Sequence, residues 1–94
     1  MKFLEYKNLL EALYIGHEFS FKYKNKSYFL ERSNNGYTLY DITDLFEHNV
    51  TGKKICEIDN SITVSLVNEF LDKKIFDGLS FNEIYNDVEI IDIE

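Results

Sequence analysis

The sequence predicts an α+β domain: an N-terminal helix, an antiparallel meander of three to four strands, a second helix, a short capped helix and a C-terminal strand. Three observations predict it. Apolar residues recur at three- and four-residue steps over residues 2–16, which is the period of a helix. The period changes to two over residues 19–42, as in half-buried strands. Two turn signals divide those strands, and tight turns between consecutive strands produce an antiparallel meander.

The predicted N-terminal helix has one apolar face. Its members are Phe3, Tyr6, Leu10, Leu13 and Tyr14, with Leu4 and Leu9 beside them. Gly16 is placed to end this helix, because glycine adopts the left-handed conformation of a helix C-terminus at little cost. We expect the face to pack on a core, with partner binding as the alternative.

The first two strands of the meander follow. In FSFKY, residues 19–23, aromatic and polar residues alternate, which is typical of a strand with one buried face. A turn around Asn25-Lys26 leads into SYFLER, residues 27–32, which we expect to form the second strand.

Asn35-Gly36 predicts a type I′ hairpin turn, because both central residues of that turn require positive φ. The third strand is then YTLYDI, residues 37–42. On the face of the sheet away from the helices, we expect Phe29 together with either the Tyr37/Leu39 set or the Tyr40/Ile42 set.

The segment between the meander and the second helix is less regular. TDLFEHN, residues 43–49, fits either a short helix or a continuation of the sheet. KICEI, residues 54–58, suits a fourth strand, joined to the third by a loop spanning Glu47 to Lys53. A second helix is predicted from Ser61 to Lys74. Its cap is Asp59, Asn60 or Ser61, and its apolar face is Ile62, Leu66, Val67, Phe70 and Leu71.

Two local signals predict the third helix. Asp77-Gly78 turns the chain, and Ser80 with Glu83 matches the capping box, in which each residue's side chain bonds the other's backbone N–H. A short helix over residues 81–86 follows from that match.

The tail VEIIDI, residues 88–93, returns to a strand, but its apolar alternation breaks between Ile90 and Ile91. A β-bulge at that point would turn all four apolar residues of the tail inward. Without a bulge, the strand would have to be buried on both faces.

Composition limits the class of protein. The 94 residues suffice for a single domain, residues 1–94, and eight Phe and seven Tyr supply a core. The single cysteine excludes an intramolecular disulfide, and no long apolar run indicates a signal peptide or a membrane span. We therefore predict a cytoplasmic protein.

The net charge of −7 is unevenly distributed. Residues 1–40 hold six bases and four acids, which gives +2, whereas residues 41–94 hold four bases and thirteen acids, which gives −9. Binding to nucleic acid or to an anionic membrane needs a basic footprint, so we expect neither. Basic protein surfaces are the expected electrostatic partners.

Residues with catalytic or metal-binding chemistry are sparse. His17, His48 and Cys56 have no metal-ligand spacing. His48 and Cys56 could face each other across the loop, but Cys56 stands among isoleucines and is expected to be a buried thiol. The four glycines lie at turns or helix ends rather than in a phosphate-binding loop. We predict no catalytic residue, no metal and no cofactor, and hence a protein that is not an enzyme.

The acids of the C-terminal half form a candidate surface for a basic partner. Its members are Glu69, Asp72, Asp77, Glu83, Asp87, Glu89, Asp92 and Glu94. Residues on one face of a strand repeat every ~6.6 Å, whereas a DNA strand offers a phosphate every ~3.4 Å. The tail alone is therefore too sparse to imitate DNA, and the helix acids would have to join it. A solvated acidic edge that discourages strand pairing is the alternative.

The segments KNKSYFLERSNNGYTLYD and KIFDGLSFNEIYNDVEIIDIE, with a leucine-rich helix between them, resemble small acidic uncharacterised bacterial proteins, often carried by prophages. Those proteins close with a K-I-D-G-K-S-L-x-E-I-W-D-E-V-E-like segment. The corresponding residues here are Lys74, Ile75, Asp77, Gly78, Ser80, Glu83, Ile84, Tyr85, Asp87, Val88 and Glu89. The departures are Phe76 ahead of Asp77, Leu79 for lysine and Tyr85 for tryptophan. The resemblance implies a helix–meander–helix architecture and no activity.

These observations favour a non-enzymatic protein-interaction module. The alternative is a phage-borne inhibitor, anti-CRISPR-like or anti-nuclease, that mimics nucleic acid and presents its acidic half to a basic nucleic-acid-binding protein. A small enzyme using Cys56 or His48 is the third hypothesis, and a homodimer stays open.

Overall fold

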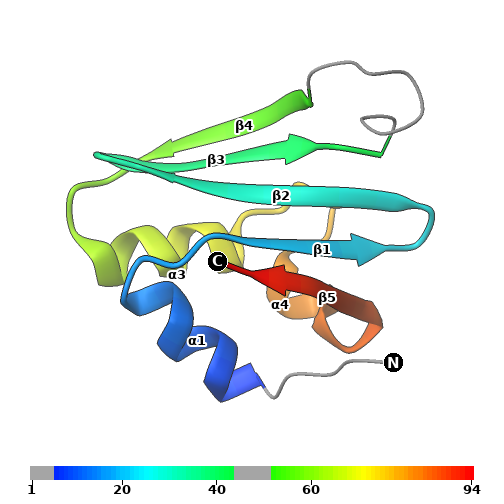
Figure 1. Ribbon diagram of the computed structural model, residues 1–94, viewed down its shortest axis with the longest axis horizontal. Coiled ribbons are helices and arrows are strands. Elements are labelled where there is room, and N and C mark those ends of the chain that lie inside the picture. Colours follow the sequence, from blue (N-terminus) through cyan, green and yellow to red (C-terminus); the bar gives the residue numbers. More distant parts are fainter. Residues whose placement is uncertain (1–5, 44–51) are drawn as a thin grey trace.

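The computed structural model describes residues 6–43 and 52–94, which form a two-layer α+β fold. In chain order the elements are α1 (Tyr6–Tyr14), β1 (Phe19–Tyr23), β2 (Lys26–Ser33), β3 (Gly36–Asp41), β4 (Lys53–Asp59), α3 (Thr63–Asp72), α4 (Phe81–Ile84), the 3-10 helix η1 (Tyr85–Asp87) and β5 (Val88–Ile93). The strands form one antiparallel sheet in the order β4-β3-β2-β1-β5, with the helices on one side of it (Figure 1). The predicted fold class and order of elements are confirmed.

Helix α1 ends at the predicted glycine. Gly16 has a φ of 91°, its N–H donates to the carbonyl of Leu13, and the N–H of His17 donates to the carbonyl of Ala12. This pair of bonds is the Schellman motif, which satisfies carbonyls that the helix end leaves free. Leu13 is buried, whereas Tyr14, predicted on the same apolar face, is exposed.

Both turns of the meander lie one residue earlier than predicted. The first hairpin turns at Lys24-Asn25 and the second at Asn34-Asn35. The predicted type I′ turn at Asn35-Gly36 is therefore wrong, because neither residue has positive φ and Gly36 is paired within the β2–β3 ladder.

Gly36 serves a different purpose, which is the close approach of β4. A Cβ at this position would lie 1.8 Å from the carbonyl oxygen of Ile58. Only glycine leaves room for the two backbones to meet there.

The predicted fourth strand is confirmed as β4, and it contains a β-bulge. Leu39 of β3 faces Cys56, but the next residue, Tyr40, faces Lys54, so Ile55 is an extra residue in β4. The segment predicted as a short helix or a strand, residues 43–49, lies beyond Thr43 outside the residues that the structure describes, and so does His48; Phe3 and Leu4 lie outside them as well.

The C-terminal strand β5 also carries a bulge, at the place that the broken alternation predicted. Ser20 faces Asp92 and Phe21 faces Ile90, which leaves Ile91 as the extra residue. The expectation that the bulge would turn Ile91 inward is wrong: Ile91 is 54% exposed. Ile90 packs against the core, as do the strand's first and last apolar residues. A bulged residue is left unpaired, and here it turns toward solvent.

The caps of α3 and α4 differ. None of the three predicted residues caps α3, whose N-cap is Ile62, although Asn60 Oδ1 accepts a hydrogen bond from the Ile62 N–H at 2.9 Å. At α4 the capping box is confirmed: the Glu83 N–H donates to Ser80 Oγ at 3.2 Å, and the Ser80 N–H donates to Glu83 Oε1 at 2.9 Å.

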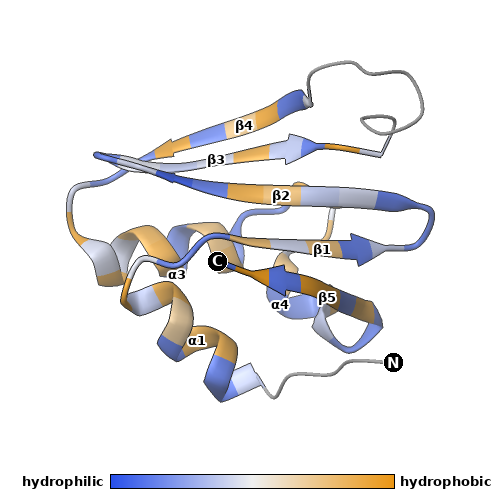
Figure 2. Ribbon diagram, in the orientation of Figure 1, coloured by the Kyte–Doolittle hydropathy of each residue, from blue (hydrophilic) through white to orange (hydrophobic). Residues whose placement is uncertain are grey.

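The core lies between the sheet and the helices and is built on aromatic rings. Phe81 of α4 is fully buried at its centre, with its ring centroid 5.2 Å from that of Phe21, 5.3 Å from that of Phe70 and 5.9 Å from that of Phe19. Apolar and polar residues alternate along the strands, so that one face of the sheet can pack on the helices (Figure 2). Phe81 thus joins β1, α3 and α4 in one cluster.

Candidate binding site

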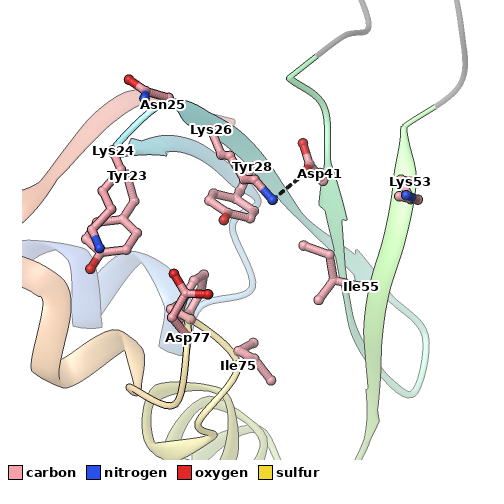
Figure 3. A pocket seen from close by; sticks show the side chains of 11 residues that line it. Tyr23, Lys24, Asn25, Lys26, Tyr28, Asp41, Lys53, Ile55, Ile75 and Asp77 are labelled. Carbon is pink, nitrogen blue, oxygen red and sulfur yellow. Dashed lines mark ion pairs between the residues drawn. The ribbon is translucent and has the colours of Figure 1, made fainter.

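A pocket of about 440 Å³ opens at one end of the two layers. It lies where the end of β1, the start of β2, the end of β3 and the start of β4 meet the chain between α3 and α4 (Figure 3). Its lining residues are Tyr23, Lys24, Asn25, Lys26, Tyr28, Asp41, Lys53, Ile55, Ile75, Phe76 and Asp77. Pockets for small molecules commonly have volumes of about 300–1,000 Å³, and this pocket lies within that range.

The floor of the pocket is aromatic. Tyr28 and Phe76 are 7% and 3% exposed, and their rings meet edge to face with centroids 5.4 Å apart. The Tyr23 ring lies 6.3 Å from that of Phe76 in the same arrangement. Ile55 is 39% exposed and, with the half-buried Ile75, adds apolar surface that water can reach.

A tight turn between α3 and α4 holds Phe76 in this floor. Asp77 has a φ of 55° and Gly78 a φ of 83°, and two backbone hydrogen bonds of 3.0 and 3.1 Å join Phe76 and Leu79. Two consecutive positive φ values between paired residues are typical of a type I′ turn. The predicted turn at Asp77-Gly78 is confirmed, and it places Asp77 at the rim of the pocket.

The carboxylate of Asp41 is fixed on the sheet side. Its Oδ1 accepts hydrogen bonds from the Thr43 N–H at 2.9 Å and from the Thr43 hydroxyl at 2.6 Å, and Lys26 Nζ lies 3.9 Å from its Oδ2. Burial raises the pKa of Asp41, but the Thr43 hydrogen bonds and the charges of Lys26 and Lys53 outweigh it and hold the pKa below its ordinary value. Asp41 is therefore an ionised, oriented group.

The hydroxyl of Tyr28 is open to the pocket. Every buried polar side-chain atom among the described residues has a hydrogen-bond partner, yet the Tyr28 hydroxyl has none in that part of the chain. Tyr28 lines the pocket, and its ring is directed into the pocket (Figure 3). The pKa of Tyr28 is raised, first by burial and then by the negative charges of Asp41 and Asp77.

Three lysines lie around the rim. Lys24 Nζ is 5.3 Å from the centroid of the Tyr23 ring, and Lys26 is 63% exposed beside Asp41. Lys24 and Lys53 lie at opposite ends of the pocket, whereas Asp77 rises from below toward Tyr23 and Tyr28 (Figure 3).

The predicted acidic surface is distributed over several elements. Glu69 and Asp72 lie on α3, Asp77 at the pocket, Glu83 in α4, Asp87 in η1, Glu89 and Asp92 on β5, and Glu94 after β5. In β5, Glu89 faces Lys22 and Asp92 faces Ser20, on the side of the sheet away from the core. The α3 acids and the β5 acids therefore belong to opposite sides of the sheet.

Four of these acids have identified contacts. Lys74 Nζ lies 2.6 Å from Glu83 Oε1, and this bond together with those to Ser80 lowers the pKa of Glu83 to about 2. Asp72 Oδ1 accepts from Asn82 at 3.0 Å, and Glu89 is paired across strands with a lysine. The backbone of Glu94 exchanges two hydrogen bonds with that of Glu18. Of the eight acids of the predicted surface, only Asp77 lines the pocket.

The other chemistry-bearing residues are separate from the pocket. Cys56 is half-buried on β4, and burial raises the pKa of its thiol. His17 Nδ1 lies 2.9 Å from the backbone oxygen of Glu94. Within residues 6–43 and 52–94, no three His, Cys, Asp or Glu side chains are grouped to hold a metal ion. Over the same ranges, no helix has the length and apolar character needed to cross a bilayer.

The side of the sheet away from the helices exposes an aromatic pair. Phe29 and Tyr40 face each other across β2 and β3, and both are half-buried. Of the two sets left open, Tyr37 and Leu39 are in the core and Tyr40 is on the open side.

Comparison with known proteins adds no further assignment: no family model, curated protein or solved structure matches this chain. The resemblance to prophage-carried proteins therefore stays a prediction. The pocket was not predicted either, although Asp77 was among the candidate residues. Tyr28 and Phe76 are 48 positions apart in the sequence, and no local pattern indicates that they meet.

Proposed function

We propose that the protein is a non-enzymatic binding module that docks a segment of a partner protein in the pocket between the sheet and the α3–α4 turn. The observation that carries the proposal is the aromatic floor of Tyr28 and Phe76, reachable through a rim of polar groups. Aromatic residues at the bottom of a depression, with polar groups around them, are the usual anatomy of a protein-binding hot spot.

The site is preorganised, which supports binding. Phe76 is fixed by the turn at residues 77–78, and Asp41 by two hydrogen bonds to Thr43. A partner would therefore lose little free energy in ordering these side chains.

The acidic inhibitor remains a weaker candidate. Its array would need the α3 acids and the β5 acids on one surface, and they belong to opposite sides of the sheet. We also propose a cytoplasmic location, on the single cysteine and the lack of a long apolar run in the sequence.

Two isoleucines provide a matched test. Ile55 and Ile91 are both extra residues in bulges of edge strands and both are exposed, but only Ile55 lines the pocket. Peptides selected on the wild-type protein from a displayed random library would be synthesised, and their Kd measured by fluorescence polarisation. We expect Ile55→Glu to weaken binding by about tenfold or more, the loss of at least 1.4 kcal/mol typical of a central contact. Ile91→Glu should leave the Kd within about twofold, as a residue remote from the interface does.

The results have distinct meanings. A loss of peptide affinity in Ile55→Glu, but not in Ile91→Glu, supports docking at the pocket. Equal effects in Ile55→Glu and Ile91→Glu, or a selection that enriches no binding peptide, would overturn the proposal. Circular dichroism of both variants establishes that the fold is retained.

A further inference from the structure

We infer that the pocket accepts a cationic side chain of the partner protein, the guanidinium of an arginine or the ammonium of a lysine, bound between Asp41 and Asp77 at the hydroxyl of Tyr28. This inference rests on the proposed function, because it names the chemistry of the residue that the pocket would anchor.

The arrangement of acceptors is the first argument. The Tyr28 hydroxyl is a polar group on a side chain that is 7% exposed, it has no hydrogen-bond partner among the described residues, and it opens into the pocket. Asp41 and Asp77 line the same pocket as this hydroxyl, and their negative charges contribute to its raised pKa. Two carboxylates and a phenolic oxygen thus line the same pocket, and a group with several N–H donors suits such a set of acceptors.

The distribution of charge is the second argument. Asp41 has an ion-pair contact with Lys26 at 3.9 Å, which is a long contact from an exposed side chain, and Lys53 faces it across the β3–β4 ladder. Asp77 has no ion pair in the described part of the chain. Lys24 is held over the Tyr23 ring at the rim, and Lys53 lies at the opposite end (Figure 3). Among the described residues, the carboxylate of Asp77 at the rim is therefore not held in an ion pair by any of the three lysines that line the pocket.

The apolar walls are the third argument. Ile55 and Ile75 line the same pocket as the two acids. Long basic side chains bury their methylene stems on apolar surface while the charged head reaches polar groups. A guanidinium has the further advantage that it can stack on an aromatic ring and donate to two acceptors at once.

An anionic group is the competing occupant, since three lysines surround the rim. It would have to approach the carboxylates of Asp41 and Asp77, and like charges at short range oppose binding. The net charge of −7 also raises the local concentration of cations rather than of anions.

The inference can be tested with five peptides, acetyl-Gly-Gly-X-Gly-Gly-amide with X as Arg, Lys, citrulline, norleucine or Glu. Amide chemical shifts of the ¹⁵N-labelled protein report where and how tightly each peptide binds. We expect the Arg and Lys peptides to shift the amides of Tyr28, Asp77 and Gly78, and to bind at least about fivefold more tightly than their neutral isosteres, which corresponds to about 1 kcal/mol.

A matched pair of variants isolates the charge at the pocket. Asp77→Asn and Asp87→Asn change the net charge equally, and asparagine tolerates the positive φ of position 77. We expect Asp77→Asn to weaken the binding of the Arg peptide by about fivefold and Asp87→Asn to leave its affinity unchanged. Spermidine serves as a free polyamine, and tighter binding of spermidine than of the peptides would overturn a protein side chain as the ligand.

Other outcomes separate this inference from the proposed function. If norleucine or citrulline binds as well as lysine or arginine, the cationic specificity is wrong and docking at the pocket stands. The inference is also overturned if the Glu peptide binds most tightly, or if Asp77→Asn and Asp87→Asn lose equal affinity for the Arg peptide. It is overturned as well if neither the Arg nor the Lys peptide shifts the amide signals. The proposed function is judged independently by the Ile55→Glu and Ile91→Glu pair.

Discussion

Gly36→Ala should be one of the most destabilising single-methyl additions to this protein. Position 36 has no positive φ, so alanine meets no backbone penalty of its own there. Its Cβ, however, would lie 1.8 Å from the carbonyl oxygen of Ile58 and 2.9 Å from the carbonyl carbon. Both neighbours are backbone atoms of β4, so no side chain can rotate away to relieve the overlap.

The size of the effect follows from that overlap. Contacts of a Cβ below 3.0 Å do not occur in practice, so β3 and β4 would have to separate locally by about 1.2 Å, the difference between 3.0 and 1.8 Å. Such overpacking costs about 1–3 kcal/mol, and one weakened backbone hydrogen bond adds about 1 kcal/mol. The bond between Asn60 N–H and the Asn35 carbonyl, 2.8 Å long, adjoins the overlap. We therefore expect a loss of about 2–4 kcal/mol.

Urea unfolding followed by far-UV circular dichroism measures this loss, and the thermal midpoint should fall by about 8–32 °C, at about 4–8 °C per kcal/mol for a domain of this size. Gly78→Ala is the control, because nothing lies within 4 Å of a Cβ at position 78 and only its φ of 83° opposes alanine. That change should cost about 1–2 kcal/mol. A Gly36→Ala variant as stable as wild type, or less destabilised than Gly78→Ala, would refute the steric argument.

Two further predictions concern titratable groups. The pKa of Glu83 is lowered to about 2 by Lys74 and Ser80, so Glu83 binds its proton more weakly in the folded than in the unfolded protein. Its contribution to stability is therefore fully present above the ordinary glutamate pKa and is lost as the pH falls toward about 2. Between pH 6 and 2, the free energy of unfolding should depend less steeply on pH in Glu83→Gln than in the wild-type protein. An unchanged pH dependence would contradict the lowered pKa of Glu83. Burial raises the pKa of the Cys56 thiol, so a thiol reagent at pH 7 should react slowly with the folded protein and rapidly in urea, whereas fast reaction of the folded form would contradict its burial.

Features set by neighbouring residues were predictable from the sequence. The capping box of Ser80 and Glu83 and the turn at Asp77-Gly78 each need only four consecutive residues, and both are confirmed. The bulge near Ile90 was also visible, because an extra residue breaks the alternation wherever the strand lies.

Features set by distant residues were not predictable. Gly36 carried the local signal of a hairpin turn, but its requirement comes from Ile58 on a strand that begins 17 residues later. The pocket has the same origin, since Tyr28 and Phe76 meet only after the α3–α4 turn folds back on the sheet. Asp77 lines the pocket and was also among the residues of the predicted acidic surface, but it was included there only because it is acidic.

The two edge strands bear on how a partner can bind. β4 and β5 each carry a bulge, at Ile55 and at Ile91, and a bulge interrupts the regular row of backbone donors and acceptors that an added strand would need. Charged side chains on β4 and β5 oppose strand addition further. The bulge in β4 also brings Ile55 to the pocket lining, beside Asp41 and Lys53. The same irregularity that disfavours strand pairing at this edge therefore supplies part of the surface for docking a side chain.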